Sequence, residues 1–221
     1  MITPRLQSII DLIDAKTVAD IGTDHAYIPI RLARDNKITK AVACDKNKGP
    51  IDIARLNVEK YGLSDIIELR QGDGLSPLKK NETEAIIIAG MGGKLIADII
   101  EADIEKIGSS KLILQPMNAQ YELRKKLFEL GFTIEKEELS AEGFKVYNLM
   151  SVVVGEDKRE REEFEFHIPS ELLSHPLLKM LVDKKRREFT KIMNGQKNSA
   201  QQSEDIIIKY KDLLGMIDKL C

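Results

Sequence analysis

Between residues 17 and 154, short apolar runs rich in β-branched side chains alternate with stretches of helical periodicity. This order is typical of a mostly parallel sheet that is covered by helices on both faces. The alternation therefore predicts an α/β domain built on seven strands. The expected strands are Thr17 to Ile21, Lys40 to Cys44, Ile66 to Leu69, Ala85 to Ala89, Lys111 to Leu114, Phe132 to Glu137 and Val146 to Val153.

Helices are expected at both ends of the chain. Thr3 and Pro4 form a helix cap followed by proline at the first helical position. After Gly155, a charged linker over 156–165 leads into two helical patterns that a polar segment, 194–202, separates. The last pattern has the coiled-coil spacing through Ile206, Tyr210, Leu213, Ile217 and Leu220, and Leu178, Leu181, Val182, Phe189 and Ile192 form the facing stripe. We expect an antiparallel hairpin, and a division into an α/β domain (1–155) and a helical domain (156–221).

The overall composition excludes several classes of protein. With 34 basic and 36 acidic side chains the net charge is −2, so any nucleic-acid site must be a local patch. Cys44 and Cys221 lie too far apart for a disulfide framework or a metal-binding spacing. No apolar run approaches the ~20 residues of a membrane helix, and the first residues lack the pattern of a signal peptide. We expect a soluble cytoplasmic protein without a metal site.

The segment Asp20-Ile-Gly-Thr-Asp-His-Ala26 leaves the first expected strand and enters a helix. Gly22 allows the tight turn of a nucleotide-binding loop, but Asp24 stands where such a loop has a second glycine. A carboxylate there repels phosphate and favours a cationic ligand. An ordinary strand-to-helix turn is the alternative interpretation.

Polar residues and glycines also follow the next strands. Asp45 ends the second strand about 20 residues after the loop, where an acid can accept hydrogen bonds from ribose hydroxyls. Gly72-Asp-Gly74 follows the third strand, and Gly90-Met-Gly-Gly93 ends the fourth. Gln115-Pro-Met-Asn118 ends the fifth. Each segment alone is compatible with a plain turn, but open α/β sheets bind ligands at the carboxyl ends of their strands.

Five segments, in this order and spacing, resemble the bacterial TrmK family of tRNA methyltransferases, which modify N1 of adenine 22. They are Asp20-Ile-Gly-Thr-Asp-His-Ala-Tyr-Ile-Pro29, Lys48-Gly-Pro50, Gly72-Asp-Gly-Leu75, Ile88-Ala-Gly-Met-Gly-Gly93 and Leu112-Ile-Leu-Gln-Pro116. The resemblance implies a Rossmann-like, S-adenosylmethionine-dependent methyltransferase domain with a reversed final strand. A small coiled-coil-like helical hairpin follows it.

The resemblance also implies which residues bind the cofactor. Asp20, Gly22, Thr23, Asp24 and His25 would line its methionine end, Asp45 and Lys46 the ribose, Gly72, Asp73 and Gly74 the adenine, and Gly90 and Met91 the adjoining pocket. Adenine N1 already carries a lone pair, so no Ser, Cys or His nucleophile is required. A carboxylate or amide near the exocyclic amine would stabilise the methylated base, and Asp24, Gln115 and Asn118 are the catalytic candidates.

A band of cations on the first hairpin helix is the candidate RNA contact, and it comprises Lys184, Lys185, Arg186 and Arg187, with Lys179 and Lys191 beside them. Lys94, Arg124, Lys125 and Lys126 extend this band toward the strand ends, and Arg5 is a further candidate. A solvated helix face is the alternative.

Two other functions stay open. One is a methyltransferase with the same cofactor that acts on a small molecule or a protein, and the other is a non-catalytic RNA-binding scaffold. Binding of NAD is disfavoured by the missing glycines and by the acid that would face the phosphates. The expected assembly is a monomer or a weak dimer.

Overall fold

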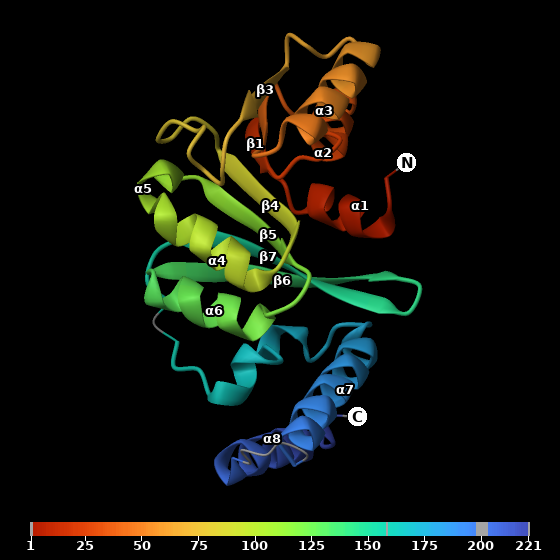
Figure 1. The fold of residues 1–221 in the computed structure, drawn as a ribbon, viewed down its shortest axis with the longest axis vertical. Helices are drawn as coiled ribbons and strands as arrows, with labels where there is room; N and C mark the ends of the chain where they lie inside the picture. Colours follow the sequence, from red (N-terminus) through yellow and green to blue (C-terminus); the bar gives the residue numbers. More distant parts are fainter. Residues whose placement is uncertain (1, 158, 198–202, 221) are drawn as a thin grey trace.

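The computed structural model describes residues 2–157, 159–197 and 203–220, and it contains one seven-stranded sheet (Figure 1). The strand order is β3-β2-β1-β4-β5-β7-β6. The strands are β1 (Thr17–Ile21), β2 (Lys40–Asp45), β3 (Ile67–Gln71), β4 (Ala85–Met91), β5 (Lys111–Pro116), β6 (Phe132–Glu142) and β7 (Lys145–Val154). Strands β1 to β5 pair in parallel, whereas β7 runs antiparallel to both β5 and β6. The seven expected strands are confirmed, and β6 extends five residues beyond its expected end at Glu137.

Helices cover both faces of the sheet. One face carries α1 (Pro4–Asp11), α2 (Tyr27–Arg34) and α3 (Lys48–Lys60), and the other carries α4 (Gly93–Ala102), α5 (Ile104–Ile107) and α6 (Gln120–Glu129). Successive side chains of a strand point to opposite faces. In β4, Ile86 and Ile88 accordingly pack beneath α4 and α6, whereas Ile87 packs with α1 and α2. The apolar runs of the sequence thus supply two cores from one sheet.

Helix α1 begins as the sequence predicts, with the Thr3 hydroxyl accepting a hydrogen bond from the Leu6 N–H at 3.4 Å. The helix is also tied to the far end of β6. The N–H of Arg5 donates to Glu142 Oε1 at 3.0 Å, and the hydroxyls of Ser8 and Ser140 are 3.0 Å apart. These contacts place the first turn of α1 beside the carboxyl ends of the parallel strands.

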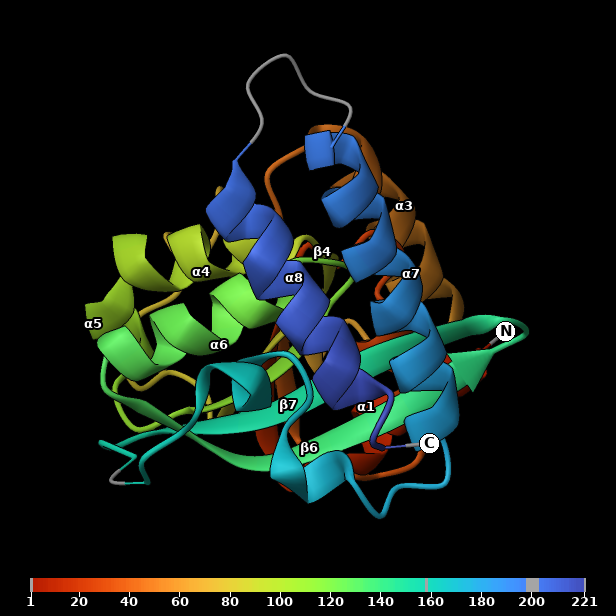
Figure 2. The ribbon, with the colours of Figure 1, turned by 90° about the horizontal axis from the view of Figure 1, so that it is seen from below.

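The expected helical hairpin is present as α7 (Leu178–Lys197) and α8 (Glu204–Ile217), which run side by side in opposite directions (Figure 2). Two short helices, η1 (Glu163–Phe166) and η2 (Ser170–Leu172), connect the sheet to it. Leu181, Phe189 and Ile217 of the hairpin are buried together with Leu139 and Val146 of the sheet. The hairpin therefore shares its core with β6 and β7.

Two expectations for the helical part stay predictions. Leu213 and Ile217 of the expected coiled-coil seam are buried, but Ile192 of the facing stripe is 39% exposed. The division of the chain at residue 155 is likewise untested, because the hairpin core includes sheet residues. Residues 198–202 of the expected polar connection, and Cys221, lie outside the described residues.

Candidate active site

Two adjoining cavities lie at the carboxyl ends of the parallel strands, and Gly22 lines both of them. The larger has a volume of about 420 Å³ and the smaller about 90 Å³. The larger is lined by Asp20, Gly22, Thr23, Asp24, His25 and Gly90 among others, and the smaller by Gly22, Asp45, Lys46, Gly72, Asp73, Gly74 and Met91 among others. All the residues that the sequence proposed for the cofactor thus line one cavity or the other. Their contact with a cofactor stays a prediction.

The loop between β1 and α2 borders both cavities through Gly22. The backbone N–H groups of Gly22 and Thr23 both donate to the Cys44 carbonyl oxygen, at 2.8 and 2.9 Å. Gly22 has a φ of +74°, and a Cβ atom added there would overlap the Met91 side chain. Asp24 and Ala26 also adopt left-handed φ values, +47° and +56°, each at a cost of roughly 1 to 3 kcal/mol. This strained turn holds Asp24 and His25 at the rim of the larger cavity.

Asp20 is the buried acid of the site and is only 5% exposed. The Thr23 hydroxyl donates to Asp20 Oδ2 at 2.6 Å. Loss of hydration on burial is the main reason that the pKa of Asp20 rises from 3.8 to about 6, and the charge of Asp45 raises it further. A carboxylate held in this way gains stability from a cation in the adjoining cavity.

The smaller cavity combines two acids with close backbone approaches. Asp45 Oδ1 accepts a hydrogen bond from the Asn47 N–H at 2.8 Å, which fixes the orientation of this carboxylate at the tip of β2. Gly74 has a φ of +53°, and an added Cβ atom there would lie 3.2 Å from Ile99 Cγ2. A side chain at Gly72 would overlap Pro77. The absence of Cβ atoms at these two glycines thus lets the loop beside Asp73 pack closely against Pro77 and Ile99.

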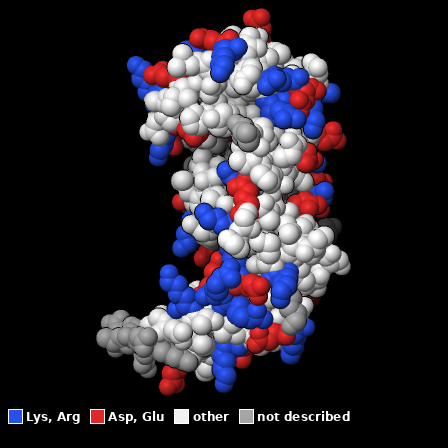
Figure 3. Space-filling view, turned by 90° about the vertical axis from the view of Figure 1, so that its right-hand side faces the viewer, with Lys and Arg blue, Asp and Glu red and all other residues white. Residues whose placement is uncertain are grey.

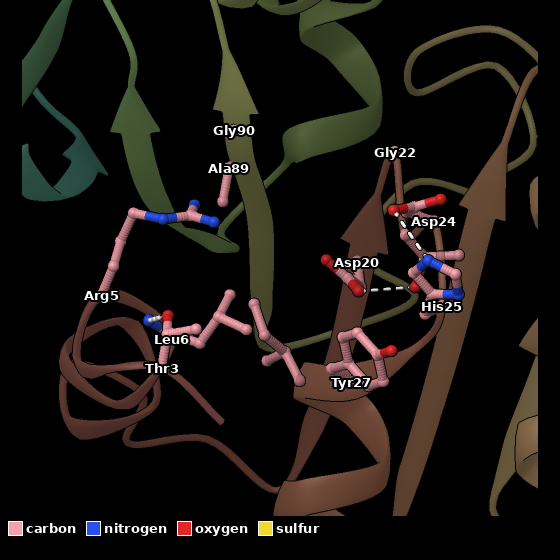
Figure 4. Close-up of a pocket in the computed structure, with 12 residues that line it drawn as sticks. Thr3, Arg5, Leu6, Asp20, Gly22, Asp24, His25, Tyr27, Ala89 and Gly90 are labelled. Atoms are coloured by element: carbon pink, nitrogen blue, oxygen red, sulfur yellow. Dashed lines mark hydrogen bonds and ion pairs between the residues drawn. The ribbon is translucent and has the colours of Figure 1, made fainter. Parts of the chain in front are cut away.

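Arg5, a predicted RNA contact, belongs to the wall of the larger cavity (Figure 4), and its contact with RNA stays a prediction. Its Nη1 donates to Gln115 Oε1 at 2.6 Å, and its guanidinium lies 5.6 Å from the centre of the Tyr147 ring. Gln115 itself is fully buried. No local sequence signal places Arg5 here, because the contact joins residues 110 positions apart.

The three catalytic candidates do not share one cavity. Asp24 lines the larger cavity, and Gln115 lies behind Arg5. Asn118 is exposed and lines a third cavity of about 470 Å³, together with Lys94, between α6 and the helical hairpin. The sequence placed Gln115 and Asn118 at one rim, but the turn after β5 separates their side chains.

Two predicted RNA contacts, Arg124 and Lys185, are mostly buried in the structure. The Arg124 guanidinium donates twice to the Glu137 carboxylate, at 2.7 Å each, and the two side chains are 1% and 2% exposed. The Lys185 side chain is 5% exposed and pairs with Glu188 at 2.9 Å. Arg124 is therefore enclosed between the sheet and the hairpin, whereas Lys185, although mostly buried, borders the third cavity.

The remaining predicted RNA contacts are distributed around helix α7. Arg187 and Lys94 are exposed, whereas Arg186 pairs with Asp183 and Asp218 at 3.0 and 2.9 Å. Figure 3 shows Lys and Arg side chains, with some acids among them, gathered where the hairpin meets the body of the molecule, beside a hollow. RNA binding by these residues stays a prediction.

Among the described residues, no group of three His, Cys, Asp or Glu side chains is arranged to hold a metal ion. Within the same ranges, every helix is too short or too polar to cross a membrane.

Comparisons with known proteins agree with this architecture. A family model described as "Methyltransferase domain" matches residues 2–150. The tRNA (adenine(22)-N(1))-methyltransferase of Bacillus subtilis is 40% identical over 157 residues, which cover 70% of this chain and 66% of that protein. The chain belongs to the TrmK family. The B. subtilis TrmK crystal structure superimposes on 100% of the chain and 98% of its own, with a TM-score of 0.88 and 29% identity.

A second TrmK-like structure covers the chain equally well. A Streptococcus pneumoniae protein, solved in complex with S-adenosyl-L-methionine, has a TM-score of 0.85 and 30% identity over 100% of this chain and 99% of that one. The structural matches span the whole chain, whereas the sequence alignment with the B. subtilis enzyme covers about two thirds of that relative. The family resemblance and the Rossmann-like methyltransferase fold expected from the sequence are therefore confirmed, and the helical part conserves its fold as well.

Proposed function

We propose that this chain transfers a methyl group from S-adenosylmethionine to N1 of adenine 22 in tRNA. The observation that carries the proposal is the full-length match to TrmK, combined with cavities whose acids and glycines come from separate strand ends. These observations favour tRNA over a small-molecule or protein substrate and over a non-catalytic RNA-binding role. We place the reaction in the cytoplasm and expect a monomer or a weak dimer.

The two cavities suit a ligand of this kind. Carboxylates Asp20 and Asp24 border the larger cavity, and Asp45 and Asp73 border the smaller one. This charge favours a ligand with cationic groups and disfavours a pyrophosphate. When bound, S-adenosylmethionine supplies an electrophilic methyl group on a sulfonium centre. We assign Asp20 and Asp24 to its methionine end, Asp45 to the ribose hydroxyls, and Asp73 to the adenine amine.

The protein has to orient the target adenine and exclude water, because N1 needs little activation as a nucleophile. N1 is shielded in folded tRNA, so the base must leave its stack to reach the cavity. Arg5, held by Gln115 at 2.6 Å, and the backbone of Gly90 form the wall opposite Asp24 (Figure 4). Asp24 is therefore our candidate for stabilising the methylated base.

Incubation of unmodified tRNA transcripts with a labelled methyl donor tests the function. We expect label in a transcript with adenine at position 22, a block to reverse transcription at that nucleotide, and no label when position 22 is guanine. Methylation of a carbon or of a ribose would refute the proposal.

Asp45→Asn tests the ribose contact. A charged acceptor contributes about 1.5 to 3 kcal/mol to a hydrogen bond, so we expect the Kd for S-adenosylmethionine, measured by calorimetry, to rise at least about tenfold. Asp65→Asn is the matched control, because Asp65 is exposed and borders neither cavity. Equal affinities for the two variants would remove Asp45 from the site.

A further inference from the structure

The hairpin of β6 and β7 projects beyond the other strands and ends in a two-residue turn, Gly143 and Phe144 (Figure 1). Pairing continues to Glu142 and Lys145, and Gly143 has a φ of +56°, as in the tight turns with glycine at the first central position. The Phe144 side chain at this tip is 99% exposed. A phenylalanine held out by paired strands and packed against nothing makes no contribution to the core.

Three cations line a cavity beside this ring. A cavity of about 310 Å³ at the tip is lined by Phe144, Lys145, Tyr147, Lys184 and Arg187, and no acid lines it. Within the described part of the chain, Lys145, Lys184 and Arg187 form no salt bridge, in contrast to their neighbours Lys185 and Arg186. The Lys184 ammonium donates to the Val146 carbonyl oxygen at 3.3 Å, and burial lowers its pKa. An anion would therefore be stabilised here, because three cations and no acid line this cavity.

The tip is connected to the proposed active site through two contacts. Tyr147, which lines the tip cavity, also lies under the guanidinium of Arg5 at 5.6 Å. Met117 lines the same cavity, and its sulfur lies 3.5 Å from Gln115 Nε2. Since Arg5 also lines the larger active-site cavity, the Arg5–Tyr147 contact joins the lining of that cavity to the lining of the tip cavity.

We propose that Phe144 stacks on a nucleobase of the tRNA next to the target adenosine, and that Lys145, Lys184 and Arg187 bind the flanking phosphates. This inference rests on the proposed function. When a base leaves its stack, its neighbours lose a stacking partner, and an exposed aromatic ring replaces that partner for any base. An aromatic side chain among unpaired cations is the combination that binds single-stranded or opened nucleic acid.

Phe144→Ala tests the stacking contact in the full chain. Stacking of a base on an aromatic side chain typically changes affinity by about ten- to a hundredfold, so we expect the Kd for the tRNA transcript to rise at least about tenfold. The single-turnover methylation rate at subsaturating enzyme should fall in parallel. Affinity for S-adenosylmethionine and the melting temperature should not change, because the ring packs against nothing.

Two further variants make this test specific. Phe144→Trp should restore tRNA affinity, since tryptophan offers a stacking surface of its own. Leu56→Ala is the matched control, because Leu56 is 67% exposed on α3, at the opposite edge of the sheet. For the cations, a Lys145→Ala/Arg187→Ala double variant should reduce the slope of log K against log salt by about 0.7 to 0.9 for each lost phosphate contact.

The outcomes separate this inference from the function. If the wild type methylates adenine 22 and Phe144→Ala binds and reacts like the wild type, the stacking contact is wrong and the function stands. If tRNA affinity depends on Phe144 but adenine 22 is not methylated, the function is wrong and the contact stands. A shift of the sedimentation coefficient in Phe144→Ala, with unchanged tRNA affinity, would assign the tip to a second copy of the chain and overturn the inference.

Discussion

Asp20→Asn is expected to stabilise the ligand-free protein above pH 6 and, at the same pH, to weaken its binding of S-adenosylmethionine. The pKa of Asp20 is about 6 in the folded protein against an ordinary value of 3.8, because the carboxyl group is buried. Between these two pH values the folded state binds more protons than the unfolded state, so the free energy of unfolding falls as the pH rises. The loss is complete above pH 6 and reaches up to about 3 kcal/mol. Asparagine does not ionise, so the Asp20→Asn variant does not undergo this loss of stability.

Urea denaturation of both proteins at pH 4 and pH 8 measures this effect. The stability difference between Asp20→Asn and the wild type should be larger at pH 8 than at pH 4. Asp65→Asn, at an exposed position, controls for the loss of one negative charge and should show no such dependence. If Asp20→Asn lowers the free energy of unfolding equally at both pH values, ionisation of Asp20 does not destabilise the folded wild type, and the prediction is wrong.

The pH dependence of cofactor binding supplies the second half of the test. A cationic ligand binds best when Asp20 is ionised, so wild-type affinity for S-adenosylmethionine should increase as the pH rises from 5 to 7, by at most about tenfold per unit. Calorimetry over this range should give a flatter profile for Asp20→Asn. A wild-type profile that is equally flat would remove Asp20 from the cation-binding part of the site.

The sequence predicts which residues lie at the strand ends better than it predicts which charged side chains are exposed. Each parallel strand can be recognised in the sequence as an apolar run. The residue that follows such a run must lie at the edge of the sheet where the carboxyl ends of the parallel strands meet. Asp24, Asp45 and Asp73 could therefore be placed at one edge of the sheet without coordinates. The positions of Arg5 and Gln115 could not, because their contact depends on how α1 docks against β6.

The exposure of Phe144 is a second feature that the sequence alone does not reveal. In the sequence it is one apolar residue between Gly143 and Lys145, and only the length of the paired strands reveals that its ring is held out in solvent. From the sequence, Lys185 and Arg124 are predicted to belong to an exposed band of cations. Helical periodicity places them on faces, but the hairpin that covers those faces is a tertiary contact. Whether a charged side chain is buried depends on the element that packs over it. When that element is distant in the sequence, no local sequence pattern indicates the burial.

Arg124→Met is expected to have the largest effect on folding. It leaves the Glu137 carboxylate, 2% exposed, without either of its two hydrogen bonds from the guanidinium, and it removes the donor to the Phe166 carbonyl oxygen at 2.9 Å. Removing one partner of a buried ion pair costs about 3 to 5 kcal/mol. Urea denaturation should show this loss. Lys126→Met on the same helix is the control, because its pairs with Glu101 and Glu129 are largely exposed and such pairs contribute at most about 1 kcal/mol.

A second substitution distinguishes a structural role of Arg124 from a role in binding RNA. In Arg124→Met/Glu137→Leu the unpaired carboxylate is gone, so most of the lost stability should return, since replacing a buried pair with apolar side chains is often neutral. The refolded double variant should then bind tRNA with wild-type affinity, because neither group reaches the surface. A double variant that is stable but binds tRNA with a reduced salt dependence would return Arg124 to the RNA interface, and would mean that the hairpin opens when tRNA binds.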